Sequence, residues 1–142
     1  MRQRILFTVG VLVGLWSSTV SAQSSSGARF DGTWGVTLIC PASQDGAKPF
    51  TFNFTAQVKD SALHGENGIA GRPGWMALDG PIQPDGSATL DARGLTGLSQ
   101  YNVSSTGQGV PYHHTVTAHF DDARGTGSWV TTRTCDFTFG KI

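Results

Sequence analysis

The sequence of 142 residues has few charged side chains, only two cysteines and no apolar run long enough to span a bilayer. Charged residues make up 14% of the chain, and ten basic side chains balance ten acidic ones. Because the basic residues form no stripe, we expect neither a nucleic-acid partner nor attraction to an acidic membrane surface. The longest apolar run covers residues 5–16. A membrane-spanning helix needs about 20 apolar residues, so no membrane span is expected.

Motifs for catalysis and metal binding are also missing. The chain has no Gly-x-Ser-x-Gly nucleophile elbow, no His-Glu-x-x-His pair and no glycine-rich phosphate loop followed by lysine. His113 and His114 are adjacent in an expected strand and so point to opposite faces, and His113 and His119 would lie roughly 20 Å apart. We therefore predict no metal, no cofactor and no enzymatic activity. A hydrolase is the weakest alternative, since ten acidic residues could include a carboxylate pair for glycoside hydrolysis.

The N-terminus has the order of features found in a secretory signal peptide. Two arginines precede the apolar run, and Val20-Ser21-Ala22 forms a small-residue cleavage site. The sequence therefore predicts three parts: a signal peptide (1–22), a flexible leader (23–29) and a single β domain (30–142). Without the signal peptide, 120 residues (142 − 22) carry eight basic and ten acidic side chains, a formal charge of −2. We expect an exported protein, either periplasmic or extracellular.

What the chain does have is a two-residue hydrophobic period. Phe50, Phe52 and Phe54 alternate with polar residues, as expected of a half-buried strand. Turn signals such as Asp45-Gly46 and Pro84-Asp85-Gly86 separate runs of this kind. The pattern predicts an all-β antiparallel meander of seven or eight strands. The expected strands are 32–40, 49–59, 61–66, 74–79, 80–83 with 87–93, 99–104, 111–120 and 126–139.

The two cysteines indicate how this meander closes. Each follows a tryptophan by six residues, in Gly32-Thr33-Trp34 to Cys40 and in Gly127-Ser128-Trp129 to Cys135. In an exported chain a lone pair of cysteines is expected to form a disulfide. That bond would make the first and last strands neighbours, which favours a closed up-and-down barrel, with a β-sandwich as the alternative.

Two residues on the expected inner face are unusual for a dry core. Arg133 is in phase with Trp129 and Cys135, and His114 is in phase with Val116. A buried cation requires an acidic partner, an anionic ligand or water, so these residues predict a polar spot in a ligand cavity. The alternative is a bulge that shifts the strand phase, or an Arg133 that reaches solvent at the barrel rim. The candidate ligand-binding residues are Trp75, Tyr112, His114, Trp129 and Arg133.

Several short segments resemble an uncharacterised family of small exported alphaproteobacterial proteins and modules. The resemblance is carried by Asp31-Gly32-Thr33-Trp34 at the start of the domain and by Cys135-Asp136-Phe137-Thr138-Phe139 at its end. It implies a bacterial periplasmic or secreted module and supplies no catalytic residue. The Gly-x-Trp start is also similar to that of avidin-type and lipocalin-type barrels, which implies that Trp34 plugs one barrel end.

These observations lead to three functional hypotheses. The first is a non-enzymatic barrel that binds a small or anionic ligand through the candidate residues. The second is an interaction module or inhibitor that contacts another exported protein through loops 65–74 or 104–111. The third is the hydrolase. The sequence does not determine the oligomeric state.

Overall fold

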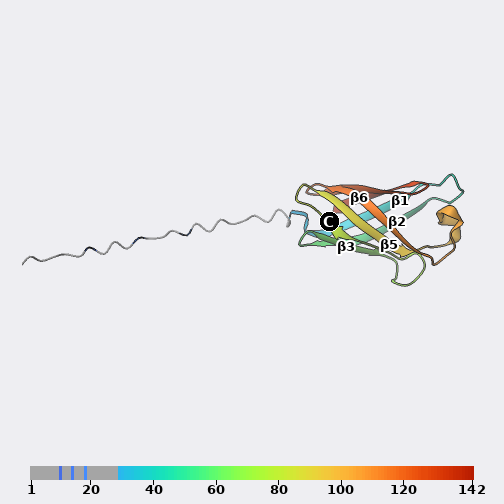
Figure 1. The fold of residues 1–142 in the computed structure, drawn as a ribbon, viewed down its shortest axis with the longest axis horizontal. Coiled ribbons are helices and arrows are strands. Elements are labelled where there is room, and N and C mark those ends of the chain that lie inside the picture. Colours follow the sequence, from blue (N-terminus) through green and yellow to red (C-terminus); the bar gives the residue numbers. More distant parts are fainter. Residues whose placement is uncertain (1–9, 11–13, 15–17, 19–28) are drawn as a thin grey trace, which may run out of the picture.

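The computed structural model describes residues 10, 14, 18 and 29–142 (Figure 1). The predicted signal peptide and leader lie outside the described residues, apart from Gly10, Gly14, Ser18 and Arg29. Residues from Arg29 onward form one β-barrel, whose long axis is horizontal in Figure 1.

Eight antiparallel strands form the barrel wall. Each strand pairs with the next one along the chain, and the last pairs with the first, so the sheet has no free edge. The predicted all-β meander and its closure into a barrel are confirmed, and the sandwich alternative is wrong. The strands are β1 (Gly32–Cys40), β2 (Phe50–Lys59), β3 (Ala62–Asn67), β4 (Met76–Pro81), β5 (Ser87–Leu95), β6 (Pro111–Phe120), β7 (Arg124–Val130) and β8 (Thr134–Lys141).

Segment 99–104, which was expected to be a strand, is instead part of a loop with two 3-10 turns, η2 (Ser99–Tyr101) and η3 (Val103–Ser105). The Asn102 side chain explains this difference. Its amide nitrogen donates to the carbonyls of Gly97, Thr106 and Gly107 at 3.0–3.2 Å. These bonds give the loop backbone a local partner in place of a neighbouring strand.

Segment 126–139 was expected to be one strand but forms two, β7 and β8, joined by a turn at residues 131–133. The turn has the sequence Thr-Thr-Arg, without Gly, Pro, Asn or Asp, so no usual turn residue marks it. The second Trp-x5-Cys segment consequently differs from the first. Trp34 and Cys40 lie on one strand, whereas Trp129 and Cys135 are partners across the β7–β8 hairpin.

The expected hairpin within 80–93 is also only partly formed. β4 ends at Pro81, and a single bridge between Ile82 and Ala88 lies between it and β5. The main pairing of β5 with β4 instead joins residues 76–79 to residues 91–94.

One end of the barrel is closed by aromatic side chains. Phe30, Trp34 and Phe120 are fully buried there, and the rings of Trp34 and Phe120 meet edge to face at 5.4 Å. The Trp34 indole N–H donates to the Phe30 carbonyl at 2.8 Å, so its one polar atom is satisfied. Gly125 permits this packing, because a Cβ there would lie 2.6 Å from the Phe120 ring. We call this the closed end.

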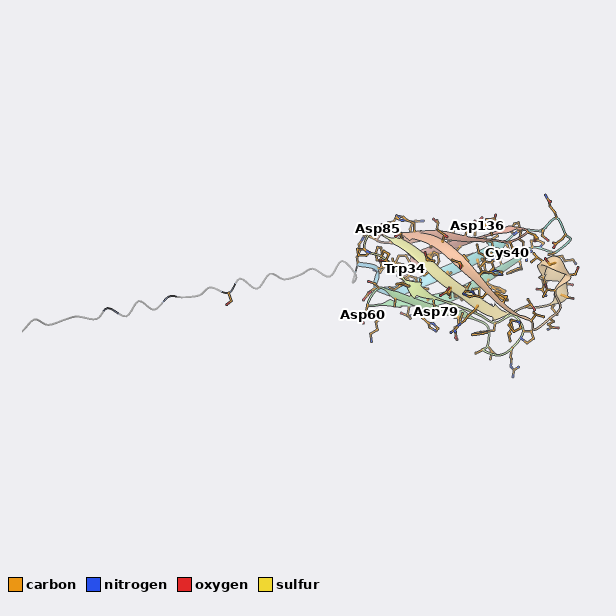
Figure 2. All side chains as sticks on the ribbon, in the orientation of Figure 1. Trp34, Cys40, Asp60, Asp79, Asp85 and Asp136 are labelled. Carbon is orange, nitrogen blue, oxygen red and sulfur yellow. A yellow bond between two sulfur atoms is a disulfide. The ribbon has the colours of Figure 1, made fainter. Side chains whose placement is uncertain are left out.

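The interior becomes less buried toward the other end. Phe50, Phe52 and Tyr112 are half-buried, although they face the same interior as the fully buried residues. We call this the open end, and the loops at the right of Figure 1 surround it. Figure 2 shows Trp34 and Cys40 toward opposite ends of β1.

The predicted disulfide is confirmed and joins the first and last strands at the open end. Cys40 and Cys135 lie 95 residues apart in sequence with their Cα atoms 4.3 Å apart. They follow directly on the β1–β8 register, in which Ile39 pairs with Asp136. The covalent bond therefore reinforces the one strand pair that no hairpin connects.

Replacing both cysteines by alanine, in Cys40→Ala with Cys135→Ala, is expected to lower the unfolding free energy by about 4 kcal/mol, because the bond closes a long loop in the unfolded chain. Urea denaturation followed by tryptophan fluorescence measures the difference. A reductant should destabilise the wild type by a similar amount and leave the double variant unchanged. A loss below about 1 kcal/mol would contradict the expectation.

Candidate functional site

A cavity of about 540 Å³ lies at the open end of the barrel. Its walls come from β2, β5, β6, β7 and β8 and from the loops 68–75, 96–110 and 131–133. Most of the lining is aromatic or aliphatic: Phe50, Phe52, Pro73, Leu95, Leu98, Tyr101, Val103, Val110, Pro111, Tyr112, His114 and Trp129. The polar lining side chains are Thr96, Asn102, Thr106, Gln108, Thr131 and Arg133.

Three rings in mutual contact form one wall of the cavity. Tyr112 and His114 share the inward face of β6, with ring centroids 5.3 Å apart and planes at 27°. The Trp129 ring continues the row from β7, 4.9 Å from His114. Gly94 faces Tyr112 across the β5–β6 pair, and a Cβ there would lie 2.8 Å from the phenol oxygen. Glycine at this position therefore leaves room for the Tyr112 side chain.

The apolar surroundings keep the titratable groups of this wall neutral. Burial lowers the pKa of His114 below its ordinary value, and the charge of neighbouring His113 lowers it further. Burial likewise raises the pKa of Tyr112, so its phenol stays protonated. At neutral pH the wall consists of an uncharged imidazole between a phenol and an indole.

The one cation that lines the cavity is Arg133, in the β7–β8 turn. Its guanidinium donates to the backbone carbonyls of Pro41 and Lys48 at 3.0 Å and to that of Tyr101 at 2.6 Å. It also lies 5.1 Å from the centre of the Phe50 ring. Burial lowers its pKa, and no carboxylate of residues 29–142 forms an ion pair with it. Arg133 thus ties three loops together at the edge of the cavity.

The β5–β6 loop (96–110) is also fastened to the β1–β2 loop (41–49). The Lys48 N–H donates to the Gln100 carbonyl at 2.8 Å, and the Ser104 N–H donates to the Asp45 carboxylate at 2.6 Å. Bonds from the Ser43 hydroxyl and from the Ser104 N–H lower the pKa of Asp45. Because these contacts join two loops on different sides of the opening, they hold the β5–β6 loop in a fixed position at the cavity.

Four of the five candidate residues from the sequence lie together on this cavity, namely Tyr112, His114, Trp129 and Arg133. Trp75 does not line it. Its backbone pairs with Leu95, and its indole nitrogen is buried without a hydrogen-bond partner. Sequence reasoning did not include Phe50 and Phe52, although their alternation on β2 already placed both on the inward face.

The remaining histidines with ionic contacts lie on the outer barrel surface. His64 contacts the Asp79 carboxylate, and His113 contacts Asp91 at 3.0 Å. In the described part of the chain, no group of three His, Cys, Asp or Glu side chains is placed to hold a metal ion. No helix among the same residues is long and apolar enough to cross a membrane.

Comparison with known proteins adds no relative to this description. No family model matches the chain, and no curated protein or solved structure matches it either. The resemblances to an exported alphaproteobacterial family and to avidin-type or lipocalin-type barrels therefore stay predictions. The fold and the site define a small closed β-barrel with one open, apolar end, and its function has to be argued from that end.

The lowered pKa of His114 predicts a loss of stability on acidification. Below about pH 6.5 the unfolded chain binds a proton at this histidine more readily than the folded chain does. The unfolding free energy should therefore fall as the pH drops from 6.5 toward the lower pKa that His114 has in the folded protein. His114→Phe should remove this contribution to the pH dependence of the unfolding free energy. Urea denaturation across this pH range measures it.

The matched control is His119→Phe, which removes an exposed histidine of the same strand. The carboxylates Asp45, Asp85 and Asp121 also have lowered pKa values, and their contribution is lost only below their ordinary value of 3.8. The two ranges are therefore separate. If the unfolding free energies of the wild type and of His114→Phe depended equally on pH in this range, His114 would not be buried as described.

Proposed function

We propose that this protein binds a small apolar ligand with an anionic or hydrogen-bond-accepting group, and that it does so without catalysis. The observation that carries the proposal is the cavity at the open end, which combines an aromatic wall with a single cation.

The size and lining of the cavity suit a compact organic molecule. Ligand pockets are commonly about 300–1,000 Å³ and mostly apolar, with a few polar groups that orient the ligand. The cavity of about 540 Å³ lies within that range. The row of Tyr112, His114 and Trp129 offers a surface against which a flat ring or an acyl chain can pack.

Arg133 supplies the polar contact. A guanidinium has five N–H donors. Three of them are bonded to carbonyls, which leaves two (5 − 3) for a ligand. The carbonyls satisfy hydrogen bonds but do not neutralise the charge. An anionic ligand group would do both, and charge-assisted hydrogen bonds are among the stronger ones.

The composition of the lining favours binding over catalysis. Among the residues that line the cavity there is neither an aspartate nor a glutamate. A carboxylate pair for glycoside hydrolysis is therefore not part of this site. His114 is the one histidine that lines the cavity, and its neighbours in the wall are Tyr112 and Trp129 rather than a serine or cysteine nucleophile.

We propose that binding takes place outside the cytoplasm, in a bacterial periplasm or in the medium. The disulfide between Cys40 and Cys135 fits an oxidising compartment, where such bonds persist. The signal peptide predicted for residues 1–22 agrees with that location.

Two fluorescent probes with the same ring system test the site. Anilinonaphthalene sulfonate carries an anionic group, whereas N-phenylnaphthylamine is uncharged. Both are expected to bind saturably, since both fit an aromatic wall. Arg133→Gln should weaken the sulfonate probe about tenfold, a loss of ~1.4 kcal/mol, and change the uncharged probe by less than about twofold.

The control is Arg124→Gln, which removes an exposed arginine at the closed end. Arg124→Gln should leave the affinity for both probes unchanged. The uncharged probe also reports whether Arg133→Gln has disturbed the loops, because a collapsed or opened cavity would change its affinity as well. Absence of saturable binding by either probe, or equal losses for both probes in Arg133→Gln, would overturn the proposal.

A further inference from the structure

Exposed aliphatic side chains gather at the open end of the barrel. In the described part of the chain six large aliphatic residues are exposed, and four of them lie in the open-end loops or directly before the β7–β8 turn. We call these four the apolar rim: Ile69, Leu98, Val110 and Val130, which are 64%, 55%, 42% and 74% exposed. Ile39 lies on the outer wall near the end of β1, and Ile142 lies at the opposite end.

The apolar rim is continuous with the cavity. Leu98 and Val110 line the cavity and are also exposed to solvent. Pro73, from the loop that carries Ile69, lines it too and lies 3.8 Å from the Cβ position of Gly109. Leu98 and Val110 therefore extend the apolar lining of the cavity to the exposed tip of the barrel.

The open-end loops carry more positive than negative charge. The open-end loops contain Lys48, Arg72 and Arg133 but a single carboxylate, Asp45. The closed end has five carboxylates in its turns and in the segment before β1, two of which are labelled in Figure 2. These are Asp31, Asp60, Asp85, Asp121 and Asp122. Four cations at the closed end, Arg29, Lys59, Arg124 and Lys141, largely offset these carboxylates, so the excess of cations in the open-end loops is what distinguishes the two ends.

We propose that the open end docks onto an anionic lipid bilayer, and that ligands pass between the bilayer and the cavity without crossing water. The apolar rim would enter the headgroup region, where aliphatic side chains leave water, and Lys48 and Arg72 would face the lipid phosphates. The closed end would point away from the surface. This inference rests on the proposed function only for the passage of ligand, and docking stands on the rim and the charges alone.

The composition of the rim favours a bilayer over a protein partner. Protein interfaces are enriched in Tyr, Trp, Phe and Met at their centre. Here the exposed tip consists of Ile, Leu and Val, while the aromatic rings lie inside the cavity. The rim side chains come from two loops and from the end of β7, spread around an opening. Such a dispersed set of side chains can insert into a fluid lipid surface, whereas it offers no flat face for a protein partner.

Vesicle flotation of the protein without the predicted signal peptide, residues 23–142, tests the docking surface. We expect binding to vesicles of phosphatidylglycerol and phosphatidylcholine in equal amounts, weaker binding to phosphatidylcholine alone, and weakening by salt. Ile69→Thr and Val130→Thr keep the branched side-chain shape but add a hydroxyl, and each should lower binding about fivefold. Arg72→Gln should lower binding to the anionic vesicles by a similar factor.

Ile142→Thr is the matched control for the apolar changes, because Ile142 is 82% exposed at the opposite end. Arg124→Gln is the corresponding control for charge. Neither should alter flotation. Ile69 and Val130 do not line the cavity, so both rim variants should bind N-phenylnaphthylamine in solution as the wild type does. Failure of docking and failure of ligand binding are thereby separate results.

Three results would overturn the inference. The first is no flotation with anionic vesicles. The second is an equal loss in Ile142→Thr and in the rim variants. The third is a rim that mediates self-association, seen as a concentration-dependent mass in sedimentation that Ile69→Thr and Val130→Thr abolish while flotation is unchanged. In that case the open end is an interface between copies of the chain.

Discussion

The pairing of β1 with β8 is the constraint on which the rest of this structure depends. Seven of the eight strand pairs join neighbours in sequence, and this one joins the two ends of the domain, next to the Cys40–Cys135 bond. Closure removes both sheet edges and gives the barrel two distinct ends. Trp34 and Phe120 fill one of them. The other can then hold a cavity without loss of the core, because the packing that stabilises the fold lies at the far end.

The sequence predicted the strands wherever alternation and ordinary turn residues agreed. It predicted the disulfide and barrel closure from the two cysteines, because a bond between residues near the two ends of a meander makes its first and last strands neighbours. It failed at Thr131-Thr132-Arg133, where β-branched residues form a turn, and at 99–104, where one asparagine side chain replaces strand pairing. Both failures concern side-chain or turn geometry that a hydrophobic period does not contain.

The candidate site was predictable to the extent that it lies on strands. Tyr112, His114 and Trp129 were placed on the inner face by alternation alone, and the structure brings them together. Arg133 reaches the cavity for a different reason from the one its phase suggested. It lies in a turn, and three carbonyls from the β1–β2 and β5–β6 loops hold it there. The loop residues of the cavity show no two-residue hydrophobic alternation, so only the folded structure shows that they line it.

In the proposed function, Arg133 both joins the loops and binds the ligand. The number of its N–H donors decides whether it can do both at once. A ligand group that uses the two unbonded N–H donors leaves the contacts with Pro41, Lys48 and Tyr101 intact, so ligand and loops are held together. A ligand that requires a third donor must displace one of these carbonyls. Of the three Arg133 contacts, the one with Tyr101 is the contact that reaches the β5–β6 loop. In the proposed function, ligand binding and loop position would consequently be linked through one side chain, and linkage of this kind acts equally in both directions.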